Sequence, residues 1–321
     1  MNHRKKEILL SLLSAAVVYL FANQAESIII RFTHPSEQAL TWISDIVLAA
    51  ALGVVTYLWL HLKAARTALS QFERDKIKLN TELSLAAEIQ RNFQPQLPSH
   101  LSGIKWAAHL QQAEKIGGDF YDLVQPDPDT IMLLLGDVSG KGIPAALLLA
   151  STSRLFRVLC RTKQNPAELV EDLSTALYED NRGFMFMTCL VACFDLKRHT
   201  LTYTNAGHPP GIIIRPSGMK LLDSGGNPVG MFESSTYDCQ TLELGVGDVG
   251  LLVTDGISEA ITEDGTAFSE ILQREIAQVT DLRSPEILCE RVMQLAKKRV
   301  GLEEYSDWTD DQTVLAFVVD G

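Results

Sequence analysis

Four groups of acidic residues after residue 100 could do chemistry. They are "GGDFYD" with Asp119 and Asp122, "GDVSGKG" with Asp137, "VTDGISEA" with Asp255 and Glu259, and "SDWTDDQT" with Asp307, Asp310 and Asp311. Three of these groups stand where an apolar run meets a turn. A single Asp before a Gly is most often a turn former. Several carboxylates that converge from distant segments would repel one another strongly unless cations lay between them.

The ligand chemistry of such a cluster favours magnesium or manganese, because both ions prefer oxygen ligands. Cys189 and Cys193 are four residues apart, but no second Cys or His pair completes a zinc pattern. The five cysteines are interpreted as buried free thiols in a reducing compartment. A formal net charge of -12 argues against nucleic acid as the main partner, since phosphate neutralisation needs basic patches.

Three other motif readings fail on the residues. "GDVSGKG" is not a Walker A loop, because no Ser or Thr follows Lys141 and Leu135 stands where the first Gly belongs. Ser139 lacks the flanking glycines of a nucleophile elbow. "GGDF" is similar to the diguanylate cyclase signature but lacks one acidic residue, so a nucleotide cyclase is a remote alternative.

The elements that must position these carboxylates are short strands with a few helices. The segments "DTIMLLLGD", "VGLLVTDG", "MFMTCLVACFDL" and "TVLAFVVD" predict buried strands. The segments "IPAALLLASTSRLFRVLC" and "SPEILCERVMQLAKKRV" predict helices, each with a proline at its start. Strands dominate the middle of the region and the helices come in pairs. This order favours an α+β sandwich, with sheets inside and helices outside, over a doubly wound sheet.

The first 62 residues predict a transmembrane hairpin of two helices, at about 8–30 and 39–62. A signal peptide is the alternative for the first run, and the second apolar run that follows almost at once argues against it. Basic residues flank the hairpin on one side only, which places the N-terminus and the C-terminal domain in the cytoplasm and the protein in the inner membrane. These residues are Arg4, Lys5 and Lys6 before the first span, and Lys63 and Arg66 after the second.

Residues 63–98 predict a linker helix with a heptad seam. Its apolar positions alternate in steps of three and four, with Lys76 and Gln90 as polar interruptions. The seam consists of Ala65, Leu69, Phe72, Leu79, Leu83, Ala86 and Phe93. The pattern favours a parallel coiled coil and hence a homodimer through 63–98, with a single amphipathic helix packed on its own domain as the alternative. "QPQLPSH" then ends the helix, and residues 99–321 form the last predicted domain.

Six segments in this order and spacing resemble the SpoIIE/RsbU branch of the metal-dependent PPM serine/threonine phosphatases. They are "AAEIQRNFQPQLP", "GGDFYD", "GDVSGKGIPAAL", "NAGHPP", "LLVTDGISEA" and "DDQT". The resemblance covers about residues 84 to 320. It implies an αββα sandwich with two Mn²⁺ or Mg²⁺ ions in a cleft at the edge of the sheets.

The same resemblance implies roles for individual residues. Asp137 would bridge both metal ions. Asp119 and the backbone carbonyl of Val138 would complete one site, and Asp255 and Asp310 the other. Asp311 is a rival to Asp310. A water activated by the metals, with Asp137 and Asp255 as the catalytic ligands, would attack phosphorus in line without a protein nucleophile.

The group that protonates the leaving oxygen stays open. Ser139 stands where the eukaryotic-type branch has a His, and a serine is a poor acid near neutral pH. His208 in "NAGHPP" is the one histidine of the motifs, with a turn-forming role or a catalytic role. Lys141 could touch the substrate phosphate or be a solvated residue near a helix start.

The sequence therefore predicts a membrane-anchored phosphoserine/phosphothreonine protein phosphatase in bacterial signalling. By family resemblance its substrate is a phosphorylated regulatory protein, of the kind of an anti-sigma factor antagonist. A change of dimer packing near Ser84 to Phe93 could order or disorder the metal site. The alternative from another class is a pseudophosphatase, a catalytically inactive dimeric membrane scaffold.

Overall fold

The computed structural model describes residues 15–20, 23, 35–95, 97–223, 225–261, 271, 275, 283–300 and 309–320. Most of the predicted first span (8–30) and Asp307 lie outside these residues. The chain divides into two compact units, Met1–Thr81 and Glu82–Gly321. The predicted boundaries after residues 62 and 98 stay predictions. The second unit begins earlier than 99, and the end of the linker helix contacts Gly117 before the third strand and Arg157 of the following helix.

One long helix, α2 (Pro35–Phe93), contains the second predicted span and the predicted linker. Among the described residues it is the one helix long and apolar enough to cross a membrane. Within the first unit α2 packs against the short described helical stretch at 15–20, where the Cβ position of Gly53 lies 3.2 Å from the Cβ atom of Ala15. Ala49, one turn before Gly53, is buried. Small residues at this contact let the two backbones approach closely.

The second unit contains two antiparallel sheets. One has the strand order β1 (His100–Leu101), β2 (Ile104–Gln111), β11 (Gln312–Val319), β10 (Val249–Val253), β7 (Gly211–Arg215) and β8 (Gly218–Leu222). The other has the order β3 (Asp119–Asp127), β4 (Thr130–Val138), β5 (Met187–Asp195), β6 (Thr200–Ala206) and β9 (Gln240–Glu243). Their facing sides share a core around Trp106, Phe194 and Phe317, whose rings pack at centroid distances of 5.0 to 5.4 Å.

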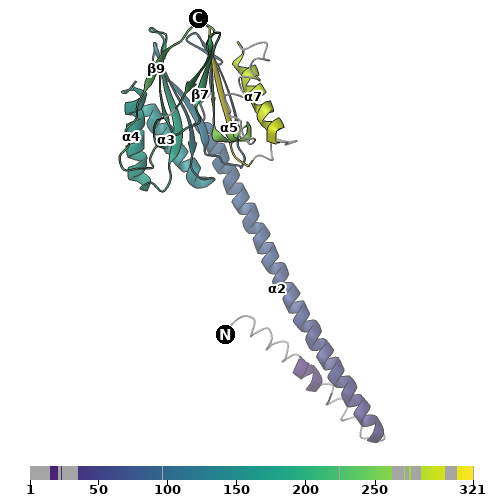
Figure 1. The fold of residues 1–321 in the computed structure, drawn as a ribbon. Helices are drawn as coiled ribbons and strands as arrows, with labels where there is room; N and C mark the ends of the chain where they lie inside the picture. The colour runs from purple at the N-terminus through teal and green to yellow at the C-terminus, as the bar shows by residue number, and fades with distance from the viewer. Residues whose placement is uncertain are drawn as a thin grey trace. The chain divides into compact units, whose positions relative to one another are not determined.

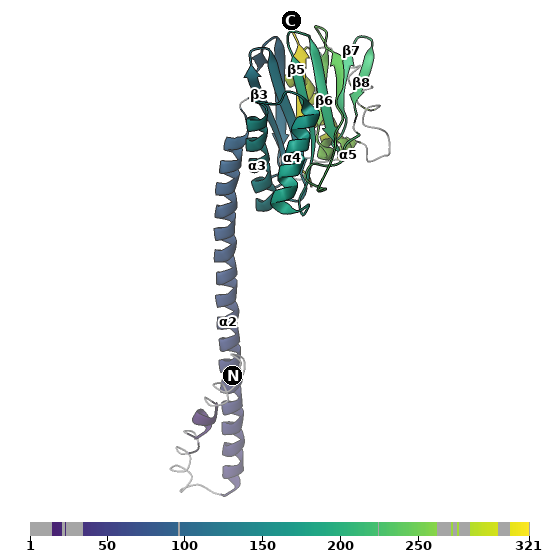
Figure 2. The same cartoon turned by 90° about the vertical axis from the view of Figure 1, so that its left-hand side faces the viewer.

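Helices cover the outer faces of both sheets (Figures 1 and 2). α3 (Ile143–Leu159) and α4 (Pro166–Asn181) pack on the five-stranded sheet through Phe156 and Leu173. α5 (Asp255–Ile261) and α7 (Pro285–Val300) pack on the six-stranded sheet. The prolines predicted to begin helices do so: Pro144 lies in the first turn of α3, and Pro285 begins α7. The predicted α+β sandwich with αββα layers is confirmed.

The strand directions bring four chain segments to one end of the sandwich. Antiparallel pairing places the first residue of β3, Asp119, directly opposite Asp137 near the end of β4. In the other sheet, Val253 at the end of β10 pairs with Val314 near the start of β11. Asp255 and Asp310 are therefore close to adjacent strand ends, and the sandwich presents all four carboxylates at the same edge.

Candidate metal centre

Asp119 is the most deeply buried of the predicted ligands, with 1% of its surface exposed. The hydroxyl groups of Thr254 and Thr313 donate to its Oδ2 atom, at 2.7 and 2.6 Å. Burial, and next the negative charge of Asp137, raise the pKa of Asp119 well above its ordinary value. Thr254, which follows β10, and Thr313 of β11 thus hold one oxygen of this carboxylate from the opposite sheet.

Asp137 lies half-buried beside Asp119 and close to the Val138 carbonyl. A Cβ atom at Gly118 would come within 2.6 Å of the Val138 carbonyl oxygen and 3.1 Å of Asp137 Oδ1. Glycine at 118 therefore lets the "GGD" backbone approach both predicted ligand atoms. Burial, then the charges of Asp255 and Asp310, raise the pKa of Asp137 from 3.8 to about 7. After burial, the main cause is thus negative charge from two other segments of the chain.

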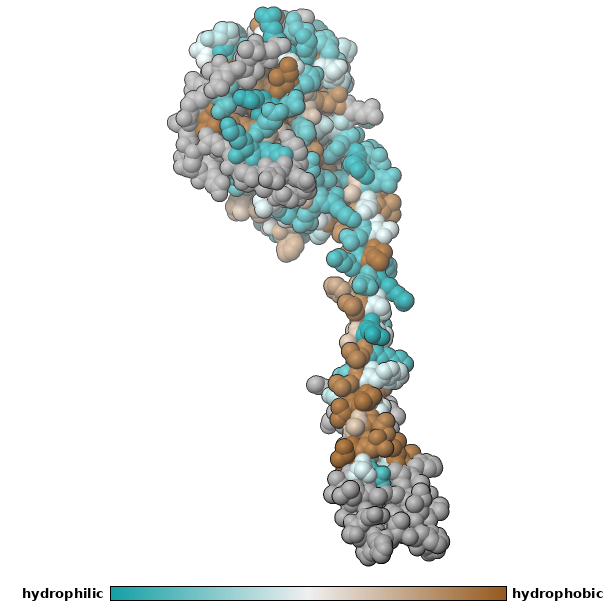
Figure 3. All heavy atoms as spheres, turned by 90° about the vertical axis from the view of Figure 1, so that its right-hand side faces the viewer, coloured by the Kyte–Doolittle hydropathy of each residue, from teal (hydrophilic) through white to brown (hydrophobic). Residues whose placement is uncertain are grey.

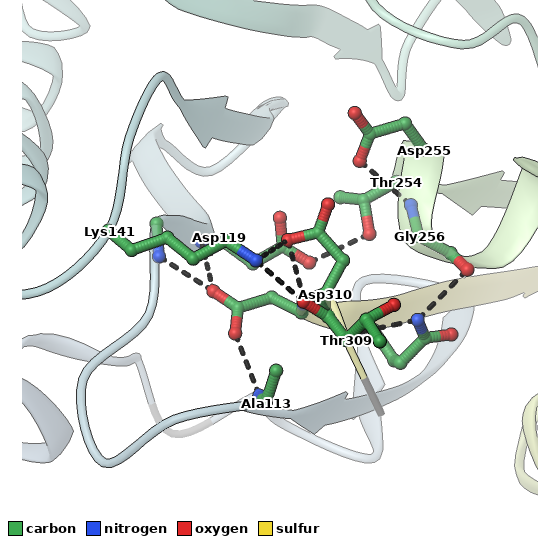
Figure 4. A network of polar contacts seen from close by, with 11 residues as sticks. Ala113, Asp119, Lys141, Thr254, Asp255, Gly256, Thr309 and Asp310 are labelled. Carbon is green, nitrogen blue, oxygen red and sulfur yellow. Dashed lines mark hydrogen bonds and ion pairs between the residues drawn. The ribbon is translucent and has the colours of Figure 1, made fainter. Parts of the chain in front are cut away.

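Asp255 and Asp310 are the other two predicted carboxylate ligands, and Figure 4 shows them together with Asp119 and Lys141. Asp255 begins α5, and its pKa is raised by burial and by the charge of Asp310. Asp310 makes an ion pair with Lys141 at 2.9 Å, and the Lys141 ammonium also donates to the Thr309 carbonyl at 2.6 Å. Lys141 thereby places a positive charge from the "GDVSGKG" segment against a predicted metal ligand. We call Asp119, Asp137, Asp255 and Asp310 the carboxylate cluster.

Asp311, the rival of Asp310, is occupied by backbone donors. Its Oδ1 accepts from the Ala113 N–H at 2.9 Å, and its Oδ2 accepts from the Gly118 N–H at 2.7 Å. The Asp119 N–H donates to the same Oδ2 at 3.4 Å. Asp311 therefore holds the loop before β3 through backbone hydrogen bonds. Asp310 instead pairs with the side chain of Lys141, which can move away when a cation binds. This difference favours Asp310 as the ligand.

The donor chemistry of the cluster fits a hard divalent cation, since it offers carboxylate oxygens and one backbone carbonyl. No group of three or more His, Cys, Asp or Glu residues in the described part of the chain is arranged to hold a metal ion on its own. A divalent cation would offset the negative charge that the four carboxylates bring together.

Of two other acidic residues in the predicted groups, Asp122 lies away from the cluster and Glu259 lies beside Asp255. Asp122 is fully buried on the α3 side of its sheet, where Ser153 and the Arg157 guanidinium donate to its Oδ2 at 2.8 and 2.7 Å. Arg157 also donates to the Phe93 carbonyl at the end of α2, at 3.1 Å. Glu259 is exposed and lines a cavity of about 450 Å³ beside Asp255. Asp122 is thus a structural residue that ties β3, α3 and the end of α2 together.

The candidates for the leaving-group acid are both engaged in the fold. His208 is buried, the Thr188 hydroxyl lies 3.0 Å from its Nδ1, and the Asn205 side chain bonds both its N–H and its carbonyl. Burial lowers the pKa of His208 to about 3, so the imidazole is neutral near pH 7. Ser139 Oγ accepts from the Phe186 N–H at 3.0 Å. These contacts favour the structural role for His208 and leave no acid at position 139.

Gln90 of α2 is a site neighbour for which the sequence predicts no role, although it interrupts the heptad seam and lies in the segment "AAEIQRNFQPQLP". Its side chain is 4% exposed, and its Nε2 donates to the Gly117 carbonyl at 2.7 Å. The Gly117 N–H donates back to Gln90 Oε1 at 3.4 Å. The linker helix therefore holds the "GGD" segment directly. A polar residue in an apolar seam was the available signal for a specific buried partner.

Comparison with known proteins supports the predicted phosphatase family. The family model for stage II sporulation protein E (SpoIIE) matches residues 127–320. Phosphoserine phosphatase RsbU of Bacillus subtilis is 27% identical over 203 residues, which are 63% of this chain and 60% of that protein. Phosphoserine phosphatase RsbP of the same organism is 29% identical over 191 residues, 57% of this chain and 47% of that protein. The chain spans about half the length of these curated relatives.

Among solved structures, the SiaA-PP2C domain of Pseudomonas aeruginosa superposes with a TM-score of 0.65 at 20% identity, over 77% of this chain and 99% of that domain. This likeness establishes the PP2C-type fold. The family match covers well over half of the chain and includes Asp137, Asp255 and Asp310. The chain belongs to the SpoIIE family.

Proposed function

We propose that this protein is a metal-dependent phosphoserine/phosphothreonine protein phosphatase that acts in bacterial signalling. The observation that carries the proposal is the convergence of Asp119, Asp137, Asp255 and Asp310 at one edge of a PP2C-type sandwich. The pKa of Asp137 is raised by the neighbouring carboxylates as well as by burial, as expected where cations belong. The relatives named phosphoserine phosphatase supply the reaction class.

Residues of this chain would divide the work as follows. Asp137 would contact both of two Mn²⁺ or Mg²⁺ ions, with Asp119 and the Val138 carbonyl on one side and Asp255 and Asp310 on the other. Such ions lower the pKa of a water and offset the charge that develops on the phosphoryl group. Thr254 and Thr313 orient Asp119, and Asp311 holds the Gly118 backbone beside the Val138 carbonyl. Lys141, once released from Asp310, would be available to the phosphate.

The linker helix would regulate the activity of the phosphatase domain. We propose that α2 anchors the protein in the inner membrane as part of a two-helix hairpin, with the sandwich in the cytoplasm. We propose further that residues 63–98 form a homodimeric coiled coil. The contact between Gln90 and Gly117 supports a coupling of helix packing to the metal site, because it joins the linker to the loop that carries Asp119. By family resemblance the substrate is a phosphorylated regulator like an anti-sigma factor antagonist.

The decisive experiment measures hydrolysis of a phosphoserine peptide by the full chain with and without Mn²⁺. Asp137→Asn removes one charge from the predicted bridging position and should lower kcat/KM by at least about 100-fold, since even groups that only orient metal ligands cost 10–100-fold when lost. Asp129→Asn is the matched control, because Asp129 forms a surface ion pair with Lys197. Absence of Mn²⁺-dependent hydrolysis by the unaltered protein would favour the pseudophosphatase instead.

A further inference from the structure

Three large apolar side chains are exposed on two loops of the sandwich. Phe184, in the loop between α4 and β5, is 87% exposed. Met231 and Phe232, which follow the isolated bridge at Val229, are 37% and 47% exposed. We call these three residues the apolar rim. Neighbouring exposed apolar residues on a soluble domain commonly mark an interaction site.

The rim is held in place by the fold. The Phe184 N–H donates to the Asn181 carbonyl at 3.1 Å, and the Asn181 side chain accepts from the Met185 N–H at 3.1 Å. Gly183 packs directly on the Met231 backbone, since a Cβ there would lie 2.9 Å from the Met231 carbonyl oxygen. The two loops therefore touch each other. Exposed side chains on such anchored loops lose little backbone freedom on binding a partner.

The rim adjoins the carboxylate cluster through the backbone. The Ser139 N–H donates to the Phe186 carbonyl at 2.9 Å, and the Phe186 N–H donates to Ser139 Oγ at 3.0 Å. Ser139 follows the predicted ligand Val138, which pairs with Met187 across β4 and β5. Phe184 is two residues before Phe186, and two residues span at most about 7 Å of chain, so Phe184 lies close to the residue that bonds Ser139. Met187 in turn bonds Val229, two residues before Met231.

We propose that the apolar rim is the docking surface for the protein that carries the phosphoserine, and that it selects apolar side chains next to that phosphoserine. This proposal rests on the proposed phosphatase function. A phosphoserine side chain is short, so a phosphate that reaches the carboxylate cluster brings the neighbouring residues of the substrate onto the edge of the site. The loops that bond to this part of the edge carry Phe184, Met231 and Phe232 as exposed apolar side chains. Aromatic side chains at the centre of a contact commonly supply much of its binding energy.

The experiment uses the full chain in lipid nanodiscs and two fluorescent phosphoserine peptides of equal length. One peptide has leucines on both sides of the phosphoserine, and the other has serines there. Binding is measured by anisotropy, and turnover is measured in parallel with Mn²⁺. We expect the unaltered protein to prefer the leucine peptide by about tenfold, the effect of one well-buried apolar contact. Phe184→Ser combined with Phe232→Ser should reduce this preference to about unity.

Val246→Ser is the matched control, because Val246 is 75% exposed but lies between β9 and β10. Its neighbour Gly247 bonds Val319 at the end of β11, so this position is at the far end of the sandwich from the cluster. The control should keep the full preference. Thermal unfolding midpoints of all variants should agree, since the substituted side chains are largely in solvent.

Three results would overturn the proposal: an unaltered protein that binds both peptides equally, a double variant that keeps the preference, and a double variant that loses binding of both peptides alike. A double variant with an altered oligomeric state and an unchanged preference would assign the rim to a second copy of the chain. If the binding preference is present and lost as expected but neither peptide is hydrolysed, docking stands and the proposed phosphatase function fails.

Discussion

The two compact units place their apolar side chains in opposite ways. In the sandwich, Trp106, Phe120 and Phe317 are each at most 2% exposed. In the first unit, Leu69 and Phe72 of α2 are 59% and 67% exposed, and apolar side chains stand out along the helix in Figure 3. The sandwich buries its apolar surface by itself. The described part of the helix does not, as the proposed membrane anchor and coiled coil would require.

The two units also differ in how they distribute their charged side chains. In the first unit, Lys63 to Lys78 of α2 carry charges of both signs, whereas the sandwich gathers Asp137, Asp255 and Asp310 at one edge with Lys141 as a neighbouring cation. Within the described residues, the helix thus exposes apolar side chains and the sandwich gathers negative charge. The proposed partner helix and the proposed cations would offset these two features.

A large effect on turnover is expected at Gly118, where the backbone passes close to two predicted ligand atoms. A methyl group there would lie 2.6 Å from the Val138 carbonyl oxygen and must displace the backbone of one predicted ligand. Gly118→Ala should lower kcat/KM for a phosphoserine peptide by about 100-fold, because displacements of about 1 Å at a reacting centre have effects of that size. Steady-state kinetics with Mn²⁺ measures it.

Gly225→Ala is the control for that substitution, because a Cβ atom at Gly225 meets nothing within 4 Å. Its kinetics should match those of the unaltered protein. Equal activity of both alanine variants would mean that the close approach of the "GGD" segment to Val138 is unimportant for turnover.

A second effect is expected on stability, from the charge at the carboxylate cluster. The folded protein holds the Asp137 proton up to about pH 7, whereas the unfolded chain releases it near 3.8. The folded state therefore binds more protons between these values, and the free energy of unfolding of the metal-free protein should fall as the pH rises through this window, by an amount on the order of a few kcal/mol.

Divalent cations bind the ionised carboxylates, so Mn²⁺ should raise the unfolding midpoint more at pH 8 than at pH 6. Thermal unfolding in Mn²⁺ and in a chelator at both pH values measures the difference. Asp137→Asn should remove most of the pH dependence and most of the response to Mn²⁺. A response that is equal at both pH values, or retained in the variant, would place the cation elsewhere.

Much of this site could be predicted because apolar runs that end at Asp and Gly correspond to strand ends. The confirmed strands β4 and β10 follow that pattern. Asp122 could have been separated from Asp119 on the same grounds. Residues three apart in a strand point to opposite faces, and Asp122 is on the α3 side with Arg157.

Other contacts have no local signal. Gln90 meets Gly117 across 27 residues, and Asp311 meets Gly118 across 193. Such pairings depend on how the linker and the two sheets come together. The heptad pattern also did not say which partner covers each position. Leu83 and Ala86 of the predicted seam are partly buried in the second unit, whereas Leu69, Phe72 and Leu79 are exposed.

The smallest effect on turnover is expected from the helix. It tests whether the exposed apolar positions of the linker contact a second copy of the chain. Leu69→Asp combined with Phe72→Asp changes two exposed seam positions, which an isolated helix would tolerate almost without cost. In the proposed coiled coil both carboxylates would be buried against a second copy. We expect a shift from dimer to monomer in analytical ultracentrifugation of nanodisc-embedded protein, and a severalfold change in kcat.

Thr67→Asp combined with Gln71→Asp is the matched control, since it adds the same two charges to exposed positions outside the predicted seam. If the seam is an interface, only the first pair of substitutions alters the mass and the rate. If both pairs act alike, the effect comes from charge near the membrane. If neither acts, the exposed apolar positions of the linker do not form an interface with a second copy of the chain.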